Sequence, residues 1–131
     1  MLLDDLETYL VGAGVTDAID KGELHETPDT VIALRETGGL PPQHAMGGGP
    51  GRPVMDTLSV QVLARAVDYV TASTLIQSVR QALDGLRDVT LNGALYYFIS
   101  AMQPPFLLMR DGNQRYVLAF NVLIRRQTTT L

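Results

Sequence analysis

Histidine, serine and the carboxylate residues could act in catalysis or bind a metal, but their spacing matches no catalytic or metal-binding motif. His25 and His44 are far apart in the sequence, and no third ligand stands at a fixed spacing from either, as a zinc site would need. The serines lack the strand–turn–helix setting of a catalytic nucleophile. Asp4, Asp5 and Glu7 are clustered, but acids on a helix surface are more often solvated than paired for acid–base catalysis. We therefore expect neither an enzyme nor a metal or cofactor site.

The glycine-rich stretch GGGPGRP, residues 47–53, resembles a phosphate-binding loop in its glycine content alone. It lacks the Gly-Lys-Ser/Thr ending of a P-loop, and its prolines have no amide hydrogen to donate to a phosphate. Nucleotide binding is therefore disfavoured. The chain also contains no cysteine, which excludes disulfides, thiol nucleophiles and cysteine-ligated zinc.

Three adjacent aromatic residues, Tyr96, Tyr97 and Phe98, could form a platform on which nucleic-acid bases stack. Neighbouring residues of a strand face opposite sides of a sheet, so we expect Tyr96 and Phe98 to share one face and Tyr97 to take the other. No arginine lies among them. The pattern favours core packing, with one tyrosine hydroxyl reaching a polar partner.

Charge is unevenly distributed along the chain, whose net charge is −4. Residues 1–36 contain nine acids against Lys21 and Arg35, whereas residues 37–131 contain eight arginines against five acids. Two interpretations remain open: a solvated acidic face, or a subunit whose opposite surfaces meet head to tail in a ring. The sequence has neither the basic stripe of a nucleic-acid-binding protein nor an apolar run of about 18 residues that could cross a membrane. The acidic N-terminus is unlike a secretory signal, so we expect folding in a cytoplasm.

The hydrophobic periodicity predicts one α+β domain over residues 1–131, with two helices and a mostly antiparallel sheet. The first helix is expected over residues 2–10. The second, over residues 68–86, should pack on one sheet face, with Asp68 or Thr71 as its N-cap and Gly85 at its end. In the last strand the apolar residues alternate, so Tyr116, Leu118, Phe120, Val122 and Ile124 should share one face. The expected strands are a short one near 22–25, then 30–36 and 55–66, and the arms of two hairpins, around Asn92-Gly93 and around residues 111–113.

A long segment, residues 38–53, is rich in glycine and proline and is predicted to form a flexible loop, neither helix nor strand. Such loops are uncommon in compact domains and are usually functional or disordered. This one carries the apolar residues Leu40 and Met46, so we expect it to become ordered against another protein. The polar tail at 127–131 is expected to fray.

Several stretches, taken in order, resemble the tail terminator proteins of long-tailed bacteriophages, a group often called phage minor capsid proteins. They are MLLDDLETYL, ALRETGGLPP, DYVTASTLIQSVRQALDGL, VTLNG and PPFLLMRDGNQRYVLAFNVLIRR. The resemblance covers nearly the whole chain and rests on order and spacing. It implies an α+β subunit that assembles as a hexameric ring on the finished tail tube, ends tube polymerisation and provides the head–tail joining surface.

The resemblance also implies the partners, which are other copies of this chain, the tail tube protein and the head-completion or connector protein. The protein would act at the head–tail junction of the virion and would be in the host cytoplasm during assembly. In such rings loops and hairpin tips contact neighbours, and Arg125 and Arg126 could meet the acidic part of the next subunit. The interface candidates are therefore Leu40, His44, Met46, Arg52, Arg110, Asp111, Asn113, Arg125 and Arg126.

The negative net charge suits a channel wall past which DNA slides without sticking, with no sequence-specific binding. The acids that we expect to line this lumen are Asp17, Asp20, Glu23 and Glu26. The alternative is a head-completion or neck adaptor on the portal side, which the sequence alone does not separate from a terminator. Neither interpretation involves a cofactor or a membrane.

Overall fold

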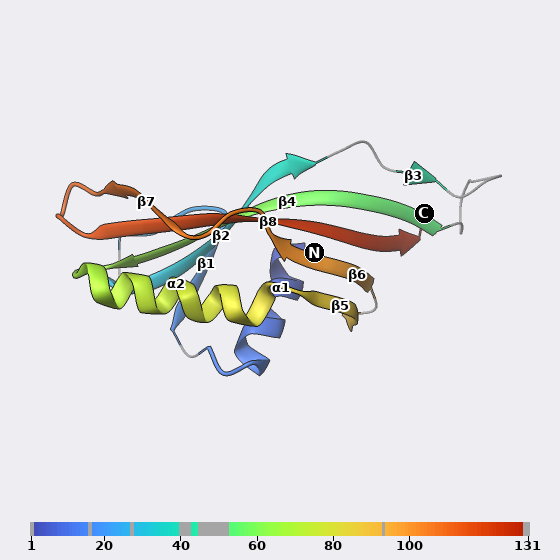
Figure 1. Ribbon diagram of the computed structural model, residues 1–131, viewed down its shortest axis with the longest axis horizontal. Helices are drawn as coiled ribbons and strands as arrows, with labels where there is room; N and C mark the ends of the chain where they lie inside the picture. The colour runs from blue at the N-terminus through green and yellow to red at the C-terminus, as the bar shows by residue number, and fades with distance from the viewer. Residues whose placement is uncertain are drawn as a thin grey trace.

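The computed structural model describes residues 2–15, 17–26, 28–39, 43–44, 53–92 and 94–129. Its elements, in chain order, are α1 (Leu2–Gly12), β1 (Ala18–Lys21), β2 (Val31–Gly39), β3 (Gln43–His44), β4 (Pro53–Ala66), α2 (Tyr69–Leu83), β5 (Leu86–Leu91), β6 (Ala94–Ala101), β7 (Phe106–Arg110) and β8 (Tyr116–Thr129) (Figure 1).

All the described strands join one sheet in the order β1-β2-β4-β8-β6-β5, with β3 added to β4 and β7 added to β8. Every pairing is antiparallel except β1 with β2. The long strands β4 and β8 pair along their whole length, and β8 then pairs with β7 near its start and with β6 near its end. The predicted α+β fold with a mostly antiparallel sheet is confirmed.

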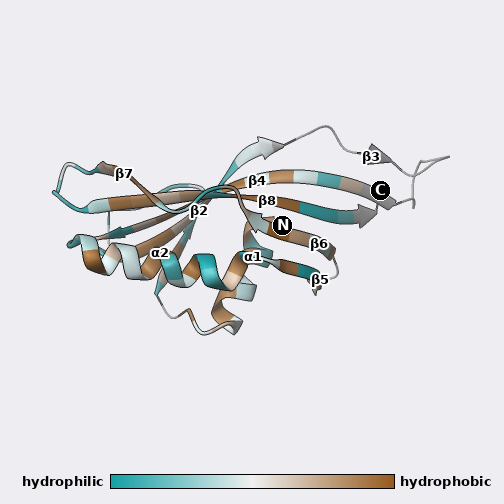
Figure 2. Cartoon of the chain, viewed as in Figure 1, coloured by the Kyte–Doolittle hydropathy of each residue, from teal (hydrophilic) through white to brown (hydrophobic). Residues whose placement is uncertain are grey.

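The main core lies between the sheet and the two helices, which cover the same face (Figure 1). Strands β2, β4, β6 and β8 contribute buried apolar residues to this face, and each helix contributes one apolar stripe, as the hydropathy colouring shows (Figure 2). The predicted face of β8 is confirmed: Leu118, Phe120, Val122 and Ile124 are buried there, and Tyr116 packs against them. The opposite sheet face has a smaller core of Ala33, Leu63, Val117 and Ala119, against which Leu24 packs.

Helix α2 begins and ends as its sequence predicts. Asp68 is the N-cap, because its carboxylate accepts hydrogen bonds from the Thr71 amide at 2.8 Å and the Thr71 hydroxyl at 2.7 Å. Gly85, just past the helix, has a φ of +86°, which glycine adopts at no steric cost. Thr71 thus donates to the cap instead of serving as one.

Three strands differ in extent from the sequence expectation because their pairing partners are distant in the chain. The short strand β1 lies at 18–21 and not at 22–25, since Ile19 pairs with Ile32 and packs on the core. Strand β8 continues to Thr129, into the tail expected to fray, because β4 offers a partner as far as Pro53. Strand β2 reaches Gly39, and β3 pairs with β4, so the expected loop 38–53 is interrupted by strand residues.

The aromatic run of β6 does not follow strict alternation. The register of β6 with β8 shifts between Tyr96 and Phe98, which leaves Tyr97 as a bulge residue. Tyr96 and Ile99 are therefore the residues that enter the main core, whereas Phe98 is half-buried outside it. The prediction that Tyr96 and Phe98 share a face was wrong for this reason, and core packing of Tyr96 is what the structure shows.

Candidate assembly surfaces

The four acids predicted to line a lumen lie on the segment that contains β1. Asp17 and Glu23 are exposed, and the Glu23 side chain retains 80% of its accessible surface. Asp20 is half-buried, and its carboxylate accepts a hydrogen bond from the His25 amide at 3.0 Å. Glu26 is exposed. The structure thus places these residues on one segment, where His25 Nδ1 lies 3.2 Å from Asp20 Oδ2 and His25 Nε2 lies 3.7 Å from Glu23 Oε1.

Two buried arginines, Arg65 and Arg115, hold the end of this acidic segment against the sheet. Arg65 Nη2 donates to the Pro28 carbonyl oxygen at 2.6 Å, and Arg115 Nη1 donates to the Glu26 carbonyl oxygen at 2.6 Å and to Asp29 Oδ1 at 3.0 Å. Burial, and next the neighbouring Arg115, lower the pKa of Arg65. Sequence reasoning missed both residues, because Arg65 alternates with the residues of β4 that face the main core and Arg115 lies in the turn before β8, so no local pattern marks either as buried.

The hairpin tip between β7 and β8 is organised by one carboxylate. Asp111 Oδ1 accepts from the backbone amides of Asn113 and Arg115 at 3.0 and 2.9 Å, and Oδ2 accepts from Arg115 Nε at 2.7 Å. Burial alone would raise the pKa of Asp111, but the hydrogen bonds from Arg115 and Asn113 outweigh it and lower the pKa. Among the interface candidates, Asp111 therefore shapes the turn, while Arg110 and Asn113 are exposed beside it.

The guanidinium of Arg110 lies over an aromatic ring. Its guanidinium carbon is 4.5 Å from the centre of the Tyr116 ring, and its Nη2 donates to the Gln114 carbonyl oxygen at 3.0 Å. Within the described part of the chain, Arg110 forms no ion pair with a carboxylate. The charge is therefore held in place and remains available to a partner.

At the other end of β8, Arg126 is turned inward. Its Nη2 lies 3.5 Å from Asp56 Oδ2, and both side chains are only 17% exposed. Its Nε is buried without a hydrogen-bond partner among the described residues. Arg125 is half-buried. Arg126 is thus engaged within its own chain, which sequence reasoning did not anticipate.

A buried polar cluster ties helix α1 to β6. Asp5 is 3% exposed, and its carboxylate accepts hydrogen bonds from Asn92 Nδ2 at 2.7 Å and from the Tyr96 hydroxyl. Burial, followed by the hydrogen bond to Asp5, raises the pKa of Tyr96. The expectation that Asp5 is a solvated surface acid was wrong, because its partners lie far along the chain. One tyrosine hydroxyl with a polar partner was expected, and the structure shows two, because the Tyr97 hydroxyl also bonds to Gln127.

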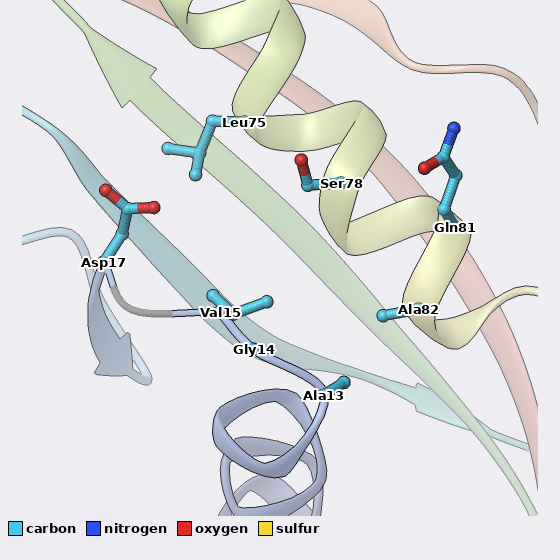
Figure 3. Close-up of a pocket in the computed structure, with 8 residues that line it drawn as sticks. All are labelled: Ala13, Gly14, Val15, Asp17, Leu75, Ser78, Gln81 and Ala82. Atoms are coloured by element: carbon cyan, nitrogen blue, oxygen red, sulfur yellow. The ribbon is translucent and has the colours of Figure 1, made fainter.

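A groove runs between α2 and the segment that links α1 to β1, and we call it the α1–α2 groove. Its larger part has a volume of about 450 Å³, and a neighbouring part of about 310 Å³ shares Asp17, Leu75 and Ser78 with it. Figure 3 shows Leu75, Ser78 and Ala82 of α2 facing Val15 and Asp17 across the larger part. Asp17 is the one charged residue among the described residues of both linings.

Strand β7 forms an exposed apolar surface that sequence reasoning overlooked. All five of its residues are exposed, and Figure 2 shows the strand as hydrophobic. The signal in the sequence was FLLM, an unbroken apolar run directly after Pro104-Pro105. Of the other interface candidates, Leu40, Met46 and Arg52 and the side chain of His44 lie outside what the structure describes.

The comparison with known families decides the identity. The sequence profile of a family described as bacteriophage tail terminator protein matches residues 9–128. The chain belongs to the bacteriophage tail terminator family. The resemblance noted in the sequence is thereby confirmed, and this tail terminator is a structural protein of the phage tail, associated with other proteins of the virion.

The fold of this tail terminator recurs in a solved particle. A chain in the virion of a native gene transfer agent (GTA) particle is similar, with a TM-score of 0.58 and 15% sequence identity, over 94% of this chain and 92% of that one. No curated protein matches the sequence. In the described ranges, no group of three histidine, aspartate or glutamate side chains could hold a metal ion, and no helix has the length and apolar character to cross a bilayer.

Proposed function

We propose that copies of this tail terminator close into a hexameric ring on the end of the tail tube, stop tube polymerisation and present the surface to which the head-completion or connector protein docks. The observation that carries the proposal is the family match over residues 9–128. It favours the tail side over the alternative of a neck adaptor on the portal side.

The surfaces of the subunit support assembly more than catalysis. A ring needs a heterologous interface, in which two different surfaces of each copy meet. The exposed apolar strand β7 and the α1–α2 groove are two such surfaces on one subunit. The exposed residues Arg110 and Asn113 extend the first of them at the hairpin tip. Arg125 and the segment 38–53 remain candidates for contacts with the tube or the head side.

The acidic segment supports a role at the channel. Asp17, Glu23 and Glu26 are exposed on one stretch of chain, and Lys21 nearby is already paired with Asp4 at 2.6 Å. We propose that these acids face the lumen, where negative charge lets DNA pass without binding. A ring structure that placed all of them on the outer rim would contradict this part of the proposal.

The function is tested by a polymerisation assay with purified tail tube protein. Tubes grown in the presence of the tail terminator should remain short and uniform in length, and added connector protein should bind at their ends. Tubes that grow to the same length with and without the tail terminator would contradict the proposal.

A further inference from the structure

Strand β7 is an edge strand whose exposed residues are apolar except for one cation, Arg110. Phe106, Leu107, Leu108 and Met109 are between 38% and 50% exposed. Edge strands normally carry charges or irregularities that discourage association. Among the described edge strands, β1 includes Asp20 and Lys21 and β5 includes Arg87 and Asp88, whereas the first four residues of β7 are all apolar. Strand β7 is therefore the edge most suited to contact another protein.

The register of β7 places its one cation beside an apolar residue. Leu107 is opposite Leu118 and Arg110 is opposite Tyr116, with a register shift between Leu107 and Met109. Directly opposite residues of two antiparallel strands point to the same face, so Leu107 and Arg110 share the face that carries Leu118 and Tyr116. This face of β7 presents an apolar side chain followed by a guanidinium.

The α1–α2 groove has the matching chemistry. Val15, Leu75 and Ala82 supply apolar surface to its larger part, which has a volume of about 450 Å³. Asp17 is exposed and lines both parts of the groove, and within the described part of the chain it pairs with no basic residue. Strand β7 extends the sheet at the edge of β8, whereas the groove lies between α2 and the segment that links α1 to β1 (Figure 1), so the two surfaces share no residue.

We propose that strand β7 of one copy docks into the α1–α2 groove of the next copy, with Leu107 against Leu75 and Ala82 and with Arg110 paired to Asp17. This inference rests on the proposed ring and names the two surfaces that join its subunits. Because the two surfaces consist of different residues, the contact is heterologous, which is the kind that produces a ring.

Disulfide trapping tests the contact cleanly, because the native chain contains no cysteine. Leu107→Cys is placed on β7 and Ser78→Cys in the groove, and the two single variants are mixed at high concentration under mild oxidation. Both residues are exposed, so both variants should fold. We expect a cross-linked heterodimer, and a ladder of larger species from a chain that carries both substitutions. Thr90→Cys, on exposed β5, replaces Ser78→Cys in the control and should give only background cross-linking with Leu107→Cys.

Charge reversal tests the pairing of Arg110 with Asp17 in the same assay. Asp17→Arg alone should lower the yield of the Leu107–Ser78 cross-link by about two- to fivefold, the effect of one exposed ion pair. Asp17→Arg belongs on the Ser78→Cys chain, and adding Arg110→Asp to the Leu107→Cys chain should restore the yield, because the two paired residues belong to different copies. A yield that falls further with both reversals would overturn the assigned pairing, provided that circular dichroism shows both chains folded.

The outcomes separate this contact from the ring itself. A cross-link yield no higher than that of the Thr90→Cys control overturns the docking of β7 in the groove. So does a dominant Leu107–Leu107 dimer, which would indicate symmetric pairing of two β7 edges, or cross-linking of Leu107→Cys to tube protein alone. If tubes are still capped in any of these cases, the proposed function stands and the ring is joined through other surfaces.

Discussion

At the scale of single residues, the carboxylate of Asp5 is a buried polar group whose partners lie far along the chain. It has two donors, Asn92 and Tyr96, and a buried acceptor that loses a partner costs more than the hydrogen bond itself contributes. We expect Tyr96→Phe to lower the free energy of unfolding by about 1–3 kcal/mol, measured by urea denaturation.

The adjacent tyrosine is a matched control for that substitution. The Tyr97 hydroxyl bonds to Gln127 in a half-buried position, where water can replace the lost partner. Tyr97→Phe should therefore destabilise the protein less than Tyr96→Phe. Equal losses for the two variants would contradict the importance assigned to the Asp5 cluster.

The stability contributed by the hairpin tip should fall in acid, because the pKa of Asp111 is lowered from its ordinary value of 3.8 in the folded state. A carboxyl group of this kind stabilises the fold above its unfolded pKa, and the contribution is lost as the pH falls through its folded pKa. Asp111→Asn should therefore melt at a lower temperature than the native chain at neutral pH.

The same difference in melting temperature should shrink below pH 3.8 and vanish once the native Asp111 is protonated. A series of thermal melts of both proteins across this range measures it. A difference that is constant with pH would show that the charge of Asp111 does not matter to the turn.

At the scale of elements, those determined by residues close together in the sequence were predictable, and those determined by distant pairing partners were not. Helix α2 and the two hairpins follow from periodicity, the Asp68 cap and turn dipeptides, all of which are read within a few residues. The extent of β1 and the bulge at Tyr97 depend on partners elsewhere in the chain. Burial of Asp5 depends on Tyr96, which is 91 residues away.

The candidate surfaces divide in the same way. Arg110 and Asn113 were predicted because they belong to a local turn, and they are exposed there. The clamp of Arg65 and Arg115 was missed because the carbonyl oxygens it binds lie between 36 and 89 residues away. These positions come together only when the sheet forms, so no local sequence pattern predicts the contact.

Helix α2 should contribute much of the stability of the fold through its buried stripe. Ile76 is fully buried in the main core, and truncating such a residue leaves a cavity that its neighbours fill only partly. Ile76→Ala should cost about 2–5 kcal/mol of unfolding free energy in a denaturant titration. Gln77→Ala, on the exposed face of the same helix, should change it by no more than about 0.5 kcal/mol. Similar effects at both positions would contradict the packing described for α2.

The arginine clamp predicts a second, regional effect. Arg65→Met removes the hydrogen bonds to the carbonyl oxygens of Pro28 and Asp29 while keeping much of the apolar stem in place. Amide hydrogen exchange of residues 22–30 should become faster by about tenfold or more, because the carbonyl groups that hold this segment to the sheet lose charged donors. Exchange in α2 serves as the internal reference. Uniform acceleration across both regions would indicate global destabilisation and not release of this segment.

At the scale of the whole molecule, the subunit is a curved sheet with both helices on one face and an unprotected apolar strand at one edge (Figure 1). Its core is complete within the chain, yet β7 remains exposed. A protein with an exposed apolar edge of this kind avoids association only if another surface covers the edge or the protein concentration is low. The exposed β7 edge is consistent with the proposed ring, in which a neighbouring copy would cover it.

The most direct test of this account is image averaging of tail-tube ends by electron microscopy after incubation with the purified protein. If six copies close into a ring, the averaged images should show one collar at a tube end, with sixfold symmetry and density for a closed ring. Bare tube ends, or copies bound singly along the tube wall, would contradict it.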